Sequence, residues 1–274
     1  MDIEKHMKRL FLIRLPAVFL LMVLLSAGRP PLQAQTDPAI WRRGETLTYK
    51  VRWSFFRLGT LRMQIADSFQ TADETVYRID LAIDSNPLLF FLNRHYRYTC
   101  LISESFKVQQ LTYLDNEEGT VYSASYVFNH ALKTVSVVMT DTSDTSRVLR
   151  KTIRYEDELY DGLSLIYFVR QTVTAVRTDT VHYIADDGYA DMIIDFQGEA
   201  KPVGVSAFSA KQQTCYIEGM VFDKGIAGLS GKFKGWFGCD AQRLPLKAAL
   251  KVFIGSVIVE LEKKEYAKER LWEE

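Results

Sequence analysis

The sequence predicts a mainly β protein: a large antiparallel curved sheet or partly closed β-barrel with one buried central helix. Most of the chain alternates apolar and polar side chains with a period of two, which is typical of strands buried on one face. Turn-forming residues separate these runs at short intervals, and only the stretch around Asp161–Arg170 carries apolar side chains at helical spacing. Because an open sheet of so many strands curls or splits, we expect curvature and partial closure.

The N-terminus has the features of a secretion signal. Basic side chains precede an apolar run between Leu10 and Leu25, and small residues follow up to a candidate cleavage position after Ala34. The uninterrupted part of this run is shorter than the roughly 20 residues that span a bilayer. We therefore expect residues 1–34 to be removed and the protein to be exported to the periplasm. A retained N-terminal anchor is the alternative.

The remaining chain suits one β-rich domain, residues 35–264, followed by a charged C-terminal tail, residues 265–274. The whole chain balances 34 basic against 34 acidic side chains. Residues 1–34 hold five basic and two acidic side chains, which leaves the exported part with a net charge of −3. This charge argues against nucleic-acid binding, which needs a basic surface.

In the N-terminal half, residues 47–53 place apolar side chains at odd positions and polar ones at even positions. The same alternation recurs at residues 61–65, 77–83 and 96–102, so we expect a half-buried strand at each. Arg57–Gly59 is expected to be the first turn, since glycine tolerates a positive φ. Further candidate strands and turns follow: strands at 108–114, 121–128, 134–139 and 148–155, and turns at Asn116–Gly119 and Asp141–Asp144.

The outward positions of these strands are charged at mid-strand, for example Lys50, Arg62 and Asp80. An outer-membrane barrel would need a tall apolar band at such positions. The pattern therefore favours water outside the sheet and an apolar interior.

The one predicted helix extends from Glu158 to about Val176. Asp161 is a good N-cap, and Ser164 is a weak capping-box partner three residues later. The first two turns are apolar nearly all round, so the helix must be buried on more than one side. It either packs on the sheet as core or plugs the mouth of the curved sheet. Arg170 follows the apolar block and needs a carboxylate partner or an exit to water.

After the helix the strand pattern resumes and ends in a charged stretch. Asp186–Gly188 is expected to be a hairpin turn. From Glu262 onward the sequence indicates a solvated helix or disorder. The candidate strands cover residues 180–185, 192–196, 203–208, 214–222, 232–239, 246–253 and 257–261.

Three cysteines are present: Cys100, Cys215 and Cys239. An exported chain can carry a disulfide. Cys215 and Cys239 lie on candidate strands of the same C-terminal run, so they are the predicted pair. The alternative is three buried thiols that act as small apolar side chains.

The sequence offers no catalytic, metal or cofactor motif. His95, His130 and His182 stand far apart, with no two at ligand spacing on one element. There is no nucleophile elbow and no phosphate loop. The glycines of Gly225–Gly231 have the wrong spacing for a dinucleotide fingerprint, and we interpret them as a flexible loop. We therefore expect no cofactor and favour a non-enzymatic function.

An apolar connection separates two of the N-terminal candidate strands. Five large apolar residues stand in a row there: Leu88, Leu89, Phe90, Phe91 and Leu92. Connections normally run over the surface and are polar, so this segment either tucks into the barrel end as core or forms an apolar lip for a ligand or a membrane surface. Aromatic residues make up 12% of the chain, which fits a filled interior and equally a cavity for an apolar ligand.

Three blocks of sequence resemble one known family, domain of unknown function 3108. The blocks are Trp41–Trp53 with Leu58 and Gly59, Asp161–Arg170, and Asp240–Leu246 followed by Ile254–Val257, Glu260 and Leu261. The resemblance implies an exported bacterial envelope protein with a β-rich fold and no established activity. Six residues match its recurrent positions: Asp161, Ser164, Arg170, Asp240, Arg243 and Pro245.

We interpret Asp161, Arg170, Asp240 and Arg243 as a structural polar cluster. In this interpretation Arg170 pairs with Asp240 or Asp161 and locks the helix to the C-terminal strands.

Three functions remain open at this point. The leading hypothesis is a non-enzymatic periplasmic protein that holds an apolar or lipid-like ligand in a cavity of the curved sheet. The second is an envelope scaffold or assembly factor that contacts a partner protein, or a membrane peripherally, through a strand edge or the lip at Leu88–Leu92. The third is an envelope hydrolase, which would need an open cleft around Arg170, Asp240 and Arg243.

Overall fold

The structure is a computed structural model that describes residues 40–89, 94–117, 120–141, 148–185, 188–222, 231–252 and 255–266. Residues 38–274 form one compact unit, to which all of these residues belong. The predicted signal segment lies outside the described residues. So do Phe90–Leu92 of the apolar connection, Asp186 and Asp187 of the predicted hairpin turn, and residues 223–230 of the glycine-rich stretch.

Within the described residues, one sheet of fifteen strands contains nearly all of the regular structure. The first meander comprises β1 (Glu45–Trp53), β2 (Phe56–Gln70), β3 (Thr75–Ser85), β4 (Arg94–Ser103), β5 (Val108–Glu117), β6 (Thr120–Asn129), β7 (Thr134–Asp141) and β8 (Val148–Arg154). The short strand β9 (Leu159–Tyr160) and the helix α3 (Gly162–Thr172) follow. The second meander comprises β10 (Val176–Ala185), β11 (Gly188–Val203), β12 (Gln212–Val221), β13 (Gly231–Gly238), β14 (Pro245–Lys251) and β15 (Ser256–Tyr266).

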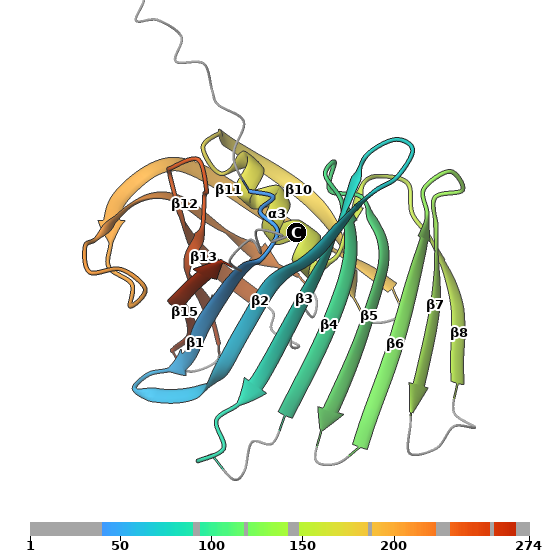
Figure 1. Cartoon of the computed structure of the whole chain (residues 1–274), viewed down its shortest axis with the longest axis horizontal. Helices are drawn as coiled ribbons and strands as arrows, with labels where there is room; N and C mark the ends of the chain where they lie inside the picture. Colours follow the sequence, from blue (N-terminus) through green and yellow to red (C-terminus); the bar gives the residue numbers. More distant parts are fainter. Residues whose placement is uncertain are drawn as a thin grey trace, which may run out of the picture. The chain divides into compact units, whose positions relative to one another are not determined.

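The two meanders join where the first strand pairs with the last. Strands β1 to β8 follow one another across the sheet, β15 to β10 continue from β1, and β9 lies beyond β10. Neighbouring strands are antiparallel except β9 and β10, which are parallel. The sheet curves but does not close, because β8 and β9 are its two edges (Figure 1). This confirms the predicted mainly β, partly closed architecture.

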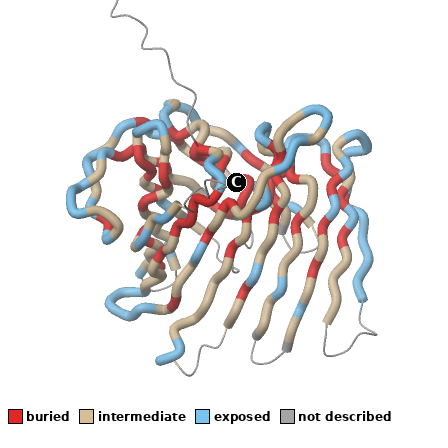
Figure 2. The backbone as a smooth tube through the Cα atoms, in the orientation of Figure 1, coloured by how far each residue is buried: buried red, intermediate tan, exposed pale blue. Residues whose placement is uncertain are grey.

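Successive connections of an antiparallel meander alternate between the two ends of the sheet. We define the open end as the one with the β1–β2, β3–β4 and β14–β15 connections. The helix α3 lies at the opposite end, the helix end, where Glu45 begins β1 and accepts a hydrogen bond from Arg170 on the helix. Buried residues gather toward the helix end, while the strands of the first meander become half-buried or exposed toward the open end (Figure 2).

The helix begins where the sequence predicts a cap. The Asp161 carboxylate accepts hydrogen bonds from the backbone N–H groups of Leu163 and Ser164 at 3.1 and 2.8 Å, and the Ser164 hydroxyl accepts one from the N–H of Asp161 at 2.8 Å. The helix is shorter than predicted because Leu159–Tyr160 pairs with β10, which itself begins at Val176. None of the helices in the described part of the chain is long and apolar enough to span a bilayer.

Two apolar clusters enclose the helix on different sides. Leu163 and Tyr167 belong to the cluster built on the first meander and on β15. Leu165 and Val169 belong to a second cluster built on strands β10 to β13. The helix is therefore buried on more than one side, as its nearly all-round apolar sequence predicts.

Three local predictions are wrong. Arg57–Gly59 is not a turn: β2 begins at Phe56, and Gly59 is buried inside the strand. Val203–Phe208 is not a separate strand, because β11 continues to Val203 and the chain then leaves the sheet. The charged C-terminal stretch from Glu262 continues β15 as far as Tyr266, where it pairs with the start of β1.

Candidate functional site

The inner face of the sheet is only partly covered by the helix. On strands β4 to β8 this face carries the buried core residues Cys100, Leu111, Tyr126, Val137 and Ile153. The same face continues toward the open end, since side chains two residues apart on a strand share a face. Beyond the core residues it carries Tyr98, Tyr113, Ala124, Met139 and Leu149, which the strand register aligns in one row.

A line of tyrosines runs along the inner face from the buried core into this uncovered region. The Tyr96 and Tyr98 rings lie 6.3 Å apart between centroids, Tyr98 and Tyr113 lie 5.6 Å apart, and Tyr113 and Tyr126 lie 6.2 Å apart. Such separations are favourable for aromatic pairs. Tyr96 and Tyr126 are buried in the core, whereas Tyr98 and Tyr113 are half-buried and form an aromatic floor on β4 and β5.

A cleft of about 550 Å³ lies on this floor near the free edge of the sheet. Six of its lining residues belong to the inner face: Tyr113, Asp115, Tyr122, Met139, Asp141 and Leu149. We call this cleft the tyrosine groove. Its volume is in the range of sites that bind small molecules.

The groove has an apolar side and a polar side. Met139 and Leu149 lie on the side of the groove nearer the helix end. Asp115 and Asp141 lie in the next row of inward-facing residues, two residues further along their strands toward the open end. Burial raises the pKa of the Asp115 carboxyl, and the nearby Arg94 partly opposes this shift. The Oδ1 atom of Asp115 is buried and accepts no hydrogen bond from the described residues, so it is available to a ligand donor.

The helix end, by contrast, is tightly packed. Trp41 is sandwiched between Tyr77 and Tyr167, with ring centroids 4.5 and 4.7 Å apart and interplanar angles of 7° and 2°. Phe106, from the β4–β5 connection, meets Phe168 of the helix edge to face. The helix therefore plugs this end of the curved sheet and leaves the groove as the uncovered part of its inner face.

A buried ion pair fixes the helix to the first strand. Arg170 donates to both carboxylate oxygens of Glu45, at 2.7 and 3.2 Å, and to the backbone carbonyl of Gln242 at 2.9 Å. The two charged side chains are 0% and 1% exposed. Burial alone would lower the pKa of Arg170, but the Glu45 carboxylate raises it above its ordinary value.

The predicted partner of Arg170 is therefore wrong. Asp161 caps the opposite end of the helix, and Asp240 accepts backbone hydrogen bonds from Gln242 and Arg243 within its own turn. Both carboxylates already accept hydrogen bonds from nearby backbone N–H groups. The buried guanidinium of Arg170 pairs with Glu45 instead. Arg243 does reach the helix, because it donates to the carbonyl of Gln171 in the last turn. The sequence pattern does not indicate the pairing of Arg170 with Glu45, because the two residues are 125 positions apart in the chain.

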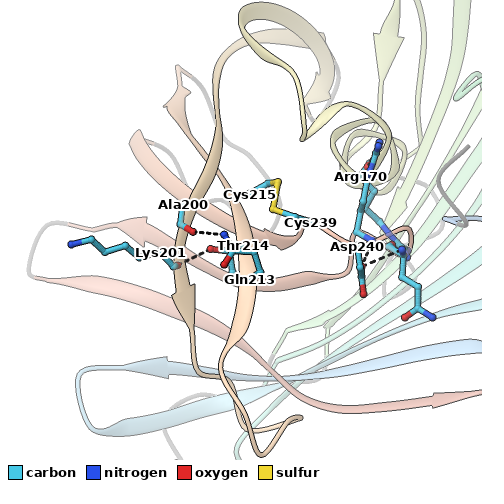
Figure 3. Close-up of a disulfide and its surroundings, with 10 residues drawn as sticks. Arg170, Ala200, Lys201, Gln213, Thr214, Cys215, Cys239 and Asp240 are labelled. Carbon is cyan, nitrogen blue, oxygen red and sulfur yellow. Dashed lines mark hydrogen bonds between the residues drawn. A yellow bond between two sulfur atoms is a disulfide. The ribbon is translucent and has the colours of Figure 1, made fainter. Parts of the chain in front are cut away.

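The two predicted disulfide partners are joined in the structure. Cys215 on β12 is bonded to Cys239, which directly follows β13 (Figure 3). Cys239 adjoins Asp240, which begins the turn that presents the Gln242 carbonyl to Arg170. The disulfide thereby ties the helix-anchoring turn to β12. Cys100 is free and buried, and burial with the nearby Asp161 raises the pKa of its thiol, which keeps it protonated and unreactive.

The predicted lip is described only at its start. Leu88 is 84% exposed and Leu89 is half-buried, while Phe90, Phe91 and Leu92 lie outside the described residues. At Leu88 the lip is therefore a surface feature of the open end. The sequence analysis does not predict the tyrosine row, because each tyrosine taken alone is an ordinary inward-facing strand residue. The recurrence of Tyr at inner positions of three successive strands is the signal that could have found it.

Across the described ranges, no group of three His, Cys, Asp or Glu side chains could hold a metal ion. His95 contacts Asp84 at 2.7 Å, and Arg97 contacts the same carboxylate oxygen at 2.7 Å. His182 contacts Asp191 at 2.7 Å and lies 3.5 Å from Asp157.

Comparison with solved structures supports the fold. A β-barrel-like protein of domain of unknown function 1849 from Brucella abortus is similar, with a TM-score of 0.51 and 7% sequence identity, covering 84% of this chain and 100% of that chain. A protein provisionally named a lipoprotein, from Parabacteroides distasonis, has a TM-score of 0.36 and 7% identity, covering 84% of this chain and 100% of that chain. At this level of identity the first likeness concerns the fold alone.

Sequence comparison places the chain in a family. No curated protein matches it. The family described as "Protein of unknown function (DUF3108)" matches residues 48–262, which is most of the chain. The matched range contains two of the three resembling blocks completely, Asp161–Arg170 and Asp240–Leu261. The protein therefore belongs to the DUF3108 family.

Proposed function

We propose that this protein is a non-enzymatic, exported cell-envelope protein that holds an amphipathic, lipid-like ligand in the tyrosine groove. The observation that carries the proposal is the exposure of the apolar inner face beyond the helix. Tyr122 and Leu149 are 42% and 45% exposed, and Tyr113 and Met139 are only half-buried. A sheet that served only as a scaffold would cover this surface, because uncovered apolar surface is unfavourable in water.

The chemistry of the groove supports an amphipathic ligand. Its apolar floor would contact a hydrocarbon or ring system, and Asp115 with Asp141 would face a polar head group at the open end. The buried, unpaired Oδ1 of Asp115 would accept a hydrogen bond from a hydroxyl or amine of that group.

Export is supported by the predicted signal segment and by the disulfide. Structural disulfides form in oxidising compartments such as the periplasm, and Cys215–Cys239 is such a bond. The proposed location is the periplasm, where lipid-like ligands would be available from two membranes.

Native mass spectrometry tests the proposal. Residues 35–274 would be purified from periplasmic extract without detergent, and bound material extracted with solvent. We expect a stoichiometric lipid-sized mass. Met139→Glu should abolish it, because a carboxylate would be placed on the apolar floor. Val138→Glu is the matched control, since Val138 is on the opposite face of the same strand. A bare polypeptide mass for the unmodified protein would overturn the proposal.

A scaffold function has one observation in its favour: β8 pairs only with β7 among the described strands and leaves its other edge open. An open edge can accept a strand of a partner protein. Cross-linking in cells that captures only monomer would exclude this second candidate. The hydrolase alternative needs an open polar cleft, whereas Arg170 is completely buried.

A further inference from the structure

The open end presents protruding apolar side chains on two neighbouring connections. Phe55 in the β1–β2 connection is 80% exposed and Leu88 in the β3–β4 connection is 84% exposed, the two highest values among large apolar side chains in the described part of the chain. Phe56 and Trp53 flank them and are 46% and 36% exposed. We call these four residues the apolar tip. Single exposed apolar residues are ordinary, but a contiguous group at one end indicates an interaction surface.

Turn chemistry does not account for the aromatic residue at the tip. Trp53 pairs with Phe56, so Ser54 and Phe55 form a two-residue hairpin turn. Ser54 has a φ of 53°, the positive value that such turns require at their first central position. Glycine, asparagine and aspartate favour these positions. The Phe55 ring contacts Phe56 of the same hairpin, with centroids 4.1 Å apart, but it remains 80% exposed and adds nothing to the core. Most of its surface is therefore free for a contact outside the molecule.

The two connections are held to each other as one rigid surface. Asn86 donates from Nδ2 to the carbonyl of Arg57 at 2.9 Å and from its backbone N–H to the carbonyl of Leu58 at 2.7 Å. Its Oδ1 accepts from the N–H of Leu88 at 3.1 Å. Leu88 is therefore fixed beside the β1–β2 hairpin, and docking the tip costs little ordering of the chain.

The charges around the tip favour a lipid surface. Residues 53–59 and 85–89 contain no acidic residue, and Arg57 is their only charged one. Lys251, at the end of β14, is exposed at the same end of the sheet. Arg57 is already paired with the Glu262 carboxylate of β15, at 2.8 and 2.9 Å. Inserting the four tip side chains would therefore desolvate no carboxylate of these two stretches, and Lys251 is the cation placed to meet anionic head groups. Tryptophan and phenylalanine are the side chains that favour this interface.

We propose that the apolar tip inserts into the interfacial region of a lipid bilayer and docks the open end of the protein on an envelope membrane. This surface is distinct from the tyrosine groove, although the polar side of the groove, with Asp115 and Asp141, lies toward the same end. A docked protein would present the groove toward the membrane from which an amphipathic ligand would enter.

Vesicle flotation tests the docking. Residues 35–274, which include the whole compact unit, would be floated with vesicles of phosphatidylcholine and phosphatidylglycerol. We expect the unmodified protein to float. The double variant Phe55→Ser/Leu88→Ser should lower the vesicle-bound fraction by about tenfold or more, because it removes two large apolar side chains from the interface.

The matched control removes two similarly exposed apolar side chains at the other end. Leu132 and Val176 are 71% and 78% exposed at the helix end, and Leu132→Ser/Val176→Ser should leave flotation unchanged. An unmodified protein that stays unbound, or a control that loses binding equally, overturns the docking. The ligand mass of the tip variant separates the two proposals, because it should stay unchanged if the groove binds independently. Conversely, Met139→Glu should lose the ligand but still float.

Discussion

The central residue of this structure is a buried charge whose partner lies in another part of the chain. The need for a carboxylate follows from the sequence alone, since Arg170 directly follows an apolar helical block. The identity of the carboxylate that pairs with Arg170 does not follow from the sequence. Asp161 and Asp240 were the predicted partners, but each is used by nearby backbone N–H groups. Short-range patterns reveal local capping, whereas the Glu45 contact depends on how β1 and β15 pair.

Removing one member of this pair should be costly. Arg170→Met would leave the Glu45 carboxylate buried without its partner, and we expect the free energy of unfolding to fall by about 3–5 kcal/mol. The double variant Arg170→Met/Glu45→Leu should recover a large part of this loss, because it leaves no unpaired buried charge. Urea unfolding of the three proteins measures both effects. A single variant as stable as the unmodified protein would contradict the role assigned to the pair.

Among the elements, the strands and the helix were predictable but several boundaries were not. Alternation identifies β1, β3 and β4 well because one face of each is buried. Gly59 was interpreted as a turn residue, yet it is buried inside β2. A Cβ atom there would overlap the carbonyl oxygen of Asp84 on β3, so the glycine permits close strand approach rather than a turn. A sequence pattern does not distinguish these two uses of glycine.

The segment after β11 illustrates a tertiary contact that overrides a strand pattern. Residues 203–208 alternate like a strand, but the chain leaves the sheet after Val203 and packs along β15. Glu260 holds it there: its Oε1 accepts hydrogen bonds from the N–H and the hydroxyl of Ser206, at 3.2 and 3.0 Å. Lys50 lies 2.9 Å from the same oxygen.

This anchoring predicts a specific pH dependence. Burial would raise the pKa of Glu260, but hydrogen bonds from Lys50 and Ser206 lower it below its ordinary 4.5. The folded state therefore binds this proton more weakly than the unfolded state. The stabilisation is complete above about pH 4.5 and is lost as the pH falls through the lowered value. Glu260→Gln should be less stable than the unmodified protein at neutral pH, and the gap should narrow in acid.

Urea unfolding at pH 7 and at steps below pH 4.5 measures the gap. Glu265→Gln is the control, because its side chain is 47% exposed and its ion pair is with the exposed Lys263. A gap for Glu260→Gln that stays constant with pH would show that this carboxylate does not anchor the segment through its charge.

At the scale of the whole molecule, the sequence predicts a curved sheet but not where it stays open. Strand counting and the absence of an apolar outer band indicate a water-exposed, barrel-like sheet. Closure depends on whether β8 and β9 meet, and nothing in either strand's pattern encodes that. For the same reason the tyrosine groove could not be predicted from the sequence. It exists because the helix leaves the inner face near β8 uncovered.

An open edge has a consequence for solubility. Most residues of β8 are exposed, and among them are the basic side chains Arg150 and Arg154. Charged side chains on an edge strand oppose pairing with the edge of another molecule. Arg150→Val/Arg154→Val should therefore produce concentration-dependent association through this edge.

Analytical ultracentrifugation over a range of concentrations detects this association. Arg78→Val is the matched control, because Arg78 lies on β3, which is paired on both sides and offers no free edge. If both variants associate equally, added surface hydrophobicity is the cause and the edge is not. If only the β8 variant associates, the two arginines keep a naturally open sheet from extending into a second copy. The same edge then stays available for a partner strand able to accommodate its positive charge.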